Sequence, residues 1–168
     1  MADAVSAAEA VNSMRTLNKA AKRVFDGFQI HACTDVTGFG LAGHSREMAL
    51  ASAVTLVYDF DAIPFISGAA KYAEQGLVPA GTYRNEDFIG SDIFFDAENE
   101  TVRSLIFDPQ TSGGLLVSVS PSEAPRILNE LATYDKTGIG TKFAIIGHVR
   151  EFDGKHIRIT NCPAENAE

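Results

Sequence analysis

A carboxylate followed closely by glycines is the stretch of this chain best suited to chemistry. Asp35 ends a β-prone segment, and Gly38 and Gly40 follow it within five positions. Glycines let the backbone adopt positive φ and approach a ligand without a Cβ in the way. If a helix begins near Phe39, the unpaired N–H groups at its start favour a phosphate, and Asp35 is placed to hold Mg²⁺ against the phosphate oxygens. The stretch is therefore predicted to present a phosphate site beside Thr37 and Gly38, with a metal at Asp35.

The same spacing also fits a plainer interpretation. Asp35 can act as the N-cap of the following helix, with the glycines serving only a tight turn. The stretch matches neither the Walker loop nor the dinucleotide-binding fingerprint. From the shape of the motif alone, a structural turn and a phosphate turn both stay open.

Three other residues with reactive or charged side chains are predicted to be structural. Cys33 is expected to be a small buried thiol, as free cysteines usually are. His44 is expected to be a satisfied structural histidine, and Arg84 a solvated surface residue. No histidines or cysteines stand at the spacing of a transition-metal site.

The composition predicts one globular domain. The 168 residues suffice for a single core, and 45% hydrophobic with 21% charged residues is ordinary for a folded chain. A net charge of −8 argues against binding to nucleic acid. No apolar run approaches the roughly 18 residues needed to span a bilayer, and the first residues lack the basic-then-apolar layout of a signal peptide. The two cysteines form no paired motif, so we expect a soluble, cytoplasmic protein.

Hydrophobic periodicity predicts alternating helices and strands. Apolar spacings of three and four residues indicate helices, and these cover residues 3–25, 39–51, 64–75, 98–106 and 121–133. Alternating or continuous apolar runs indicate strands, and these cover residues 31–35, 54–60, 115–119, 142–151 and 155–159. This order favours an α/β sandwich with a mixed sheet.

The segments between these helices and strands are predicted to be loops and turns. Turn-forming residues predict a long loop over 78–87, another over 134–140, and a hairpin turn at 153–154 that pairs the last two strands. Residues 88–95 fit neither helix nor strand clearly. The polar tail, 161–168, is expected to fray.

A second polar, glycine-containing turn precedes the strand at 115–119. The two turns read TDVTGFGL over Thr34–Leu41 and FDPQTSGGL over Phe107–Leu115, about seventy positions apart, and the second is expected to line a pocket beside the first. Together they resemble the selenophosphate synthetase (selenide, water dikinase) family. The resemblance extends to residues 13–18 and 79–85 and covers nearly the whole chain.

The resemblance implies a fold and a place in a larger protein. The chain is similar to the C-terminal half of such enzymes, a three-layer arrangement of helices around a mixed sheet that is shared with aminoimidazole ribonucleotide synthetase. Residues 1–168 are then one domain of a two-domain enzyme. The N-terminal catalytic half, with its cysteine or selenocysteine nucleophile and most metal-binding aspartates, is absent. Met1 leading directly into a helix is accordingly not expected to be the natural start of the enzyme.

The resemblance also implies an activity. Enzymes of this family make selenophosphate, AMP and phosphate from selenide, ATP and water with Mg²⁺, and act as homodimers. Asp35 matches a metal-binding aspartate, with Thr37, Gly38 and Gly40 on the phosphate side. No nucleophile matches, so this half alone is expected to be inactive.

The resemblance assigns no role to some of the matched positions. These are Asn85, Gln110, Thr111 and Ser112, for which shaping the sheet or a domain contact is as good an explanation as ligand binding. Ala42 departs from the larger apolar residue expected there, which affects packing and not the metal site. Two alternatives remain: a non-catalytic scaffold that binds a nucleotide or partner, and another ATP-using enzyme of the superfamily, such as thiamine-monophosphate kinase or the hydrogenase maturation dehydratase. The motif at 108–114 disfavours the second.

Overall fold

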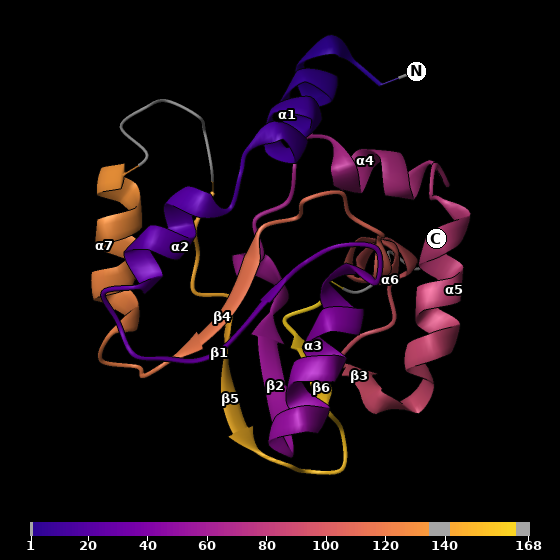
Figure 1. Cartoon of the computed structure of the whole chain (residues 1–168). Helices are drawn as coiled ribbons and strands as arrows, with labels where there is room; N and C mark the ends of the chain where they lie inside the picture. The colour runs from indigo at the N-terminus through magenta and orange to yellow at the C-terminus, as the bar shows by residue number, and fades with distance from the viewer. Residues whose placement is uncertain (1, 135–141, 164–168) are drawn as a thin grey trace.

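The computed structural model describes residues 2–134 and 142–163 (Figure 1). Its helices are α1 (Ala4–Arg15), α2 (Lys19–Phe25), α3 (Gly40–Ser52), α4 (Ala69–Glu74), α5 (Ala80–Ile89), α6 (Glu100–Phe107) and α7 (Ala124–Tyr134), with short 3₁₀ turns η1 (Phe60–Ala62) and η2 (Gly90–Asp92). Its strands are β1 (Ile30–Asp35), β2 (Val54–Asp59), β3 (Ile93–Phe95), β4 (Leu115–Val119), β5 (Gly147–Glu151) and β6 (Ile157–Thr160).

The strands form a mixed sheet and a separate ladder. The four-stranded sheet has the order β3-β6-β2-β5, with β6 parallel to both β3 and β2 and with β5 antiparallel to β2. Strands β1 and β4 pair only with each other, antiparallel, with Asp35 opposite Leu115. The fold is thus the predicted α/β class with a mixed sheet, and the ladder leaves one face of β1 open.

Two apolar clusters hold these layers together. The larger joins α3 and α6 to the four-stranded sheet, where Ile157 and Ile159 are 0% exposed. The smaller joins α2 and α7 to the ladder through Val24, Ile127 and Leu131. Helix α5 packs outside α3 and α6, as Figure 1 shows. Ile30 at the start of β1 packs on the smaller cluster, whereas Val36 in the β1–α3 connection belongs to the larger one.

The single helix predicted over 3–25 is in fact two helices. Thr16 leaves the helical region at ψ 120°, and its hydroxyl and N–H groups both bond to Asn12 O. Threonine side chains compete in this way with helix propagation. The break lets α1 lie against residues 67–72 while α2 packs on α7. Periodicity alone does not reveal this change of direction.

Two predicted boundaries between residues 64 and 89 are wrong. The helix over 64–75 is only α4, because Gly68 adopts φ +81° where Ser6 of α1 approaches its backbone. The loop over 78–87 is largely α5. Its breakers, Pro79 and Gly81, fall at the N-cap and in the first turn of that helix, where they are tolerated.

The predicted hairpin between the last two strands is also wrong. Strands β5 and β6 never pair, because β2 lies between them. Thr55 of β2 is buried and bonds to both Asp153 and Lys155, so the turn at 153–154 crosses the end of β2. Because β2 is buried, the backbone N–H and C=O groups along both of its edges need partners, which β5 and β6 supply. The strand predicted over 142–151 starts only at Gly147.

The remaining elements follow the predictions within a few residues. Strands β1, β2 and β4 and helices α3 and α6 lie where expected, and α7 begins at Ala124 after a turn that starts at Ser120. Residues 88–95 finish α5 and form η2 and β3. The tail predicted to fray from residue 161 is ordered at its start, because the N–H groups of Asn161 and Cys162 donate to the carboxylate of Asp96. Of the loop expected at 134–140, Tyr134 instead ends α7. Residues 135–140 and the tail after residue 163 lie outside the described residues.

Candidate functional site

The first polar turn connects β1 to α3. Asp35 is the exposed last residue of β1, and α3 begins five positions later at Gly40. The Gly40 N–H donates to Thr37 O at 3.0 Å and closes the turn. Gly38 is exposed, with nothing within 4 Å of the position of a Cβ, and neither its N–H nor that of Phe39 donates to another group in the described part of the chain. The turn therefore has two free donors beside an exposed carboxylate.

The second polar turn is hydrogen-bonded to the first. Val36 N donates to Gly114 O at 2.9 Å, and Gly113 N donates to Val36 O at 2.8 Å. Gln110 N donates to Thr37 O at 3.0 Å. The antiparallel pairing of β1 with β4 sets this register. The expected proximity of the two turns is thus found, although they are about seventy residues apart in sequence.

Asn85 fastens both turns to α5. Its side-chain amide donates to Gly38 O at 3.0 Å and to Phe107 O at 2.9 Å, and the residue is buried. These are the carbonyl groups of one residue in the first turn and of the residue that ends α6. The resemblance gave Asn85 no role. Its two hydrogen bonds identify it as a structural residue that holds the two turns against α5.

Two of the glycines are required by close packing. Gly40 has φ +68°, and a Cβ there would lie 2.7 Å from Asp108 O. A Cβ on Gly113 would meet the Gln110 side chain and Val36 O. Gly40 therefore lets the first turn press against the second, and its own N–H is used inside the turn. Ser112, which is not glycine, also adopts positive φ, at 51°.

Thr37 and His44 form a contact that the sequence did not reveal. Thr37 Oγ1 lies 3.1 Å from His44 Nε2, and His44 Nδ1 lies 3.2 Å from Glu47 Oε2. His44 is 8% exposed, so the prediction of a satisfied histidine is confirmed. The available signal was spacing: His44 and Glu47 stand one turn apart on a helix that begins directly after the polar turn.

Cys33 is exposed, and the prediction of a buried thiol is wrong. Alternate residues of β1 face solvent because the two-stranded ladder is covered on one side only, so His31, Cys33 and Asp35 share the open face. Partial desolvation of the sulfur, together with the charge of Asp35, raises the pKa of the Cys33 thiol. The thiol is thus poorly suited to act as a nucleophile.

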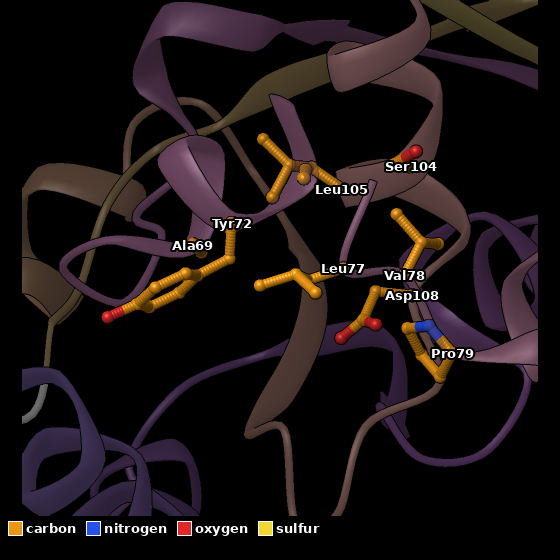
Figure 2. Close-up of a pocket in the computed structure, with 9 residues that line it drawn as sticks. Ala69, Tyr72, Leu77, Val78, Pro79, Ser104, Leu105 and Asp108 are labelled. Atoms are coloured by element: carbon orange, nitrogen blue, oxygen red, sulfur yellow. The ribbon is translucent and has the colours of Figure 1, made fainter. Parts of the chain in front are cut away.

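The side chain of Asp108 does not join the polar turns. It lies in a separate hollow between α4, the start of α5 and α6, where Figure 2 shows its carboxylate beside Leu77 and Pro79. Burial raises the pKa of this carboxyl group. The motif at 108–114 therefore contributes backbone groups to the candidate site, whereas the Asp108 side chain lines the separate hollow.

The donor set limits which metal fits. Within residues 2–134 and 142–163, no group of three or more His, Cys, Asp or Glu side chains is arranged to hold a metal ion. The turn offers a single carboxylate, Asp35. Mg²⁺ is commonly bound by one or two carboxylates together with waters and substrate phosphates. The residues present thus fit a partial Mg²⁺ site and no complete one.

Comparison with known proteins decides the family. The model of the AIR synthase related protein C-terminal domain matches residues 2–159. The chain belongs to this family. Its matched segment includes both polar turns and every described strand except the last residue of β6.

Relatives of this family member are selenide, water dikinases. One from Caldanaerobacter subterraneus subsp. tengcongensis is 44% identical over 142 residues, which are 84% of this chain and 40% of that protein. One from Treponema denticola is 40% identical over 148 residues, 88% of this chain and 42% of that protein. Selenide, water dikinase 2 of Peptoclostridium acidaminophilum is 47% identical over 125 residues, 74% and 36% respectively. The family member thus spans about two fifths of the length of these curated relatives.

None of the helices in the described ranges is both long and apolar enough to cross a membrane.

Proposed function

We propose that this chain is the C-terminal domain of a selenide, water dikinase and forms one wall of its ATP site. The observation that carries the proposal is the hydrogen-bonded pair of polar turns, with the Asp35 carboxylate exposed at its edge. The names of the relatives supply selenide and water as acceptors of a dikinase, and the family resemblance adds ATP as the phosphate donor. The remainder of the site, including the nucleophile, would come from a preceding N-terminal half.

Each residue of the first turn has a separate task in this proposal. Asp35 would hold Mg²⁺, which when bound neutralises charge on the ATP phosphates. Thr37 and Gly38 lie on the phosphate side, where the free N–H groups of Gly38 and Phe39 can donate to phosphate oxygens. Gly40 provides the backbone conformation that brings the turn against Asp108 O.

No residue of this chain is assigned a catalytic role. The turn binds and orients, and it does not supply a group that attacks or transfers a proton. The chain alone is therefore proposed to be inactive. As in the family it resembles, the complete enzyme is proposed to be a cytoplasmic homodimer, and the free thiols of Cys33 and Cys162 suit a reducing compartment.

Calorimetric titration with Mg²⁺ and ATP tests the binding role. Asp35→Asn should weaken Mg²⁺-dependent ATP binding by at least about tenfold, as loss of a metal-site group does. Asp61→Asn, at an exposed position in η1, is the matched control and should leave the affinity unchanged. Equal affinity of Asp35→Asn and the native chain would contradict the assignment, and AMP formation from ATP and selenide by the chain alone would contradict its inactivity.

A further inference from the structure

A hydroxyl of the first polar turn, an imidazole and a carboxylate form a chain of two polar contacts. His44, on the second turn of α3, contacts Thr37 through Nε2 and Glu47 through Nδ1, at 3.1 and 3.2 Å. The Phe39 ring lies against the imidazole in a T-shaped contact, with 5.8 Å between the ring centroids. The next cation along α3, Arg46, is paired with Asp92 instead. The imidazole is thus buried, with a hydroxyl on one side, a half-exposed carboxylate on the other, and no competing charge from Arg46.

The partners of the imidazole determine where its proton lies. A carboxylate accepts hydrogen bonds and does not donate them, so Nδ1 must carry the proton that bonds to Glu47. In a neutral imidazole the other nitrogen is then an acceptor. With Nδ1 carrying the only ring proton, the Thr37 hydroxyl donates to Nε2. Its oxygen keeps its lone pairs for another partner.

A hydroxyl in this state does not suit a bare phosphate oxygen, which needs a donor. It suits a hard cation, for which oxygen lone pairs are the preferred ligands, and a Ser or Thr hydroxyl binds Mg²⁺ in other phosphate loops. We propose that His44 is a positioning residue: with Glu47 it fixes the Thr37 hydroxyl so that its oxygen faces the cation that accompanies ATP. This inference rests on the proposed function and gives Thr37 a cation, not a phosphate, as its direct partner.

The position of the proton can be read without any ligand. In the chain labelled with ¹⁵N in its histidines, nitrogen shifts distinguish protonated from unprotonated ring nitrogens, and His44→Gln assigns the signals. We expect Nδ1 protonated and Nε2 unprotonated. Thr37→Val should move the Nε2 signal alone, and Glu47→Ala should mix the two tautomers. Asp92→Asn, which breaks the other ion pair of α3, is the matched control and should change neither.

A proton on Nε2, or on both nitrogens, would overturn the inference, because the Thr37 hydroxyl would then be free to donate outward. A second measurement addresses the cation, with Mn²⁺ and ATP as the probe and electron paramagnetic resonance as the readout. Thr37→Val should weaken Mn²⁺ binding about tenfold while Thr37→Ser retains it, and equal binding by Thr37→Val and the native chain would overturn the inference. Failure of the native chain to bind Mn²⁺ with ATP would instead overturn the proposed function, whatever the tautomer of His44.

Discussion

The side-chain amide of Asn85 donates to the carbonyl oxygen of Gly38 at 3.0 Å, so a helix that contributes no ligand shapes the candidate phosphate turn. The same amide reaches Phe107 O at 2.9 Å. Through these two bonds α5 fixes the spacing between the first turn and the end of α6. The position of the turn therefore depends on a residue 47 positions away in sequence.

Asn85→Ala should destabilise the chain by about 2 kcal/mol. It leaves the buried carbonyl of Phe107 without its donor, which costs about 1–3 kcal/mol, and removes the bond to the carbonyl of the exposed Gly38. Urea denaturation measures the change. Asn129→Ala, at an exposed position of α7, is the control and should change the free energy of unfolding by less than about 0.5 kcal/mol. Similar changes in the free energy of unfolding for both variants would show that Asn85 does not stabilise the two turns.

Replacing two glycines of the first turn by alanine should have very different effects on the free energy of unfolding. Gly40→Ala places a Cβ 2.7 Å from Asp108 O at φ +68°, and should lower the free energy of unfolding by about 2 kcal/mol or more. Gly38→Ala meets nothing within 4 Å and should change it by less than about 0.5 kcal/mol. The same denaturation experiment compares them. A costly Gly38→Ala with a neutral Gly40→Ala would contradict the geometry of the turn.

Asp108→Asn should stabilise the chain at neutral pH. Burial raises the pKa of this carboxyl group in the folded state, so the folded state disfavours its charged form. The penalty is absent below the unfolded pKa of about 3.9 and develops as pH rises through the higher folded value. Melting temperatures across this pH range should therefore show a gain from Asp108→Asn at pH 7 that shrinks toward pH 4. A gain independent of pH would rule out this explanation.

The docking of α1 should weaken in acid. Lys142, and then Ser67, lower the pKa of Glu9 to about 2 by bonding to its carboxylate. The stabilisation is present above the unfolded pKa of about 4.3 and is lost as pH falls toward 2. Hydrogen-exchange protection factors of α1 should fall over this range while those of β2 and β6 persist. Glu9→Gln should lower α1 protection already at pH 7, and Glu74→Gln should not; equal protection in both variants would refute the role of Glu9.

Local patterns predicted the elements that surround the candidate site. The apolar run of β2 and the helical spacing of α3 and α6 reflect burial in one core, so their periodicity is readable without the fold. The two polar turns were recognisable because each combines glycines with polar residues next to a strand. Their contact follows from the pairing of β1 with β4.

The misplaced features depend on contacts between distant residues. Nothing near Asp153 shows that β2 will lie between β5 and β6, because that order depends on the pairing of the backbone groups of β2, about a hundred residues away in sequence. The exposure of Cys33 follows from the ladder having only one covered face. The contact between Thr37 and His44 depends on the angle at which α3 leaves the turn, and the sequence does not specify that angle. The role of Asp35 stays a prediction, since one carboxylate makes only part of a metal site.

The binding position of a metal–nucleotide complex on this chain is the most direct test of the proposed function. Amide spectra recorded during titration with Mn²⁺ and ATP report this directly, because Mn²⁺ broadens the signals of nearby residues. We predict broadening centred on Asp35, Gly38 and Phe39, extending to the adjoining turn at 110–114, and absent in Asp35→Asn. Broadening centred on the hollow around Asp108, or broadening at the turn that persists in Asp35→Asn, would contradict the proposal.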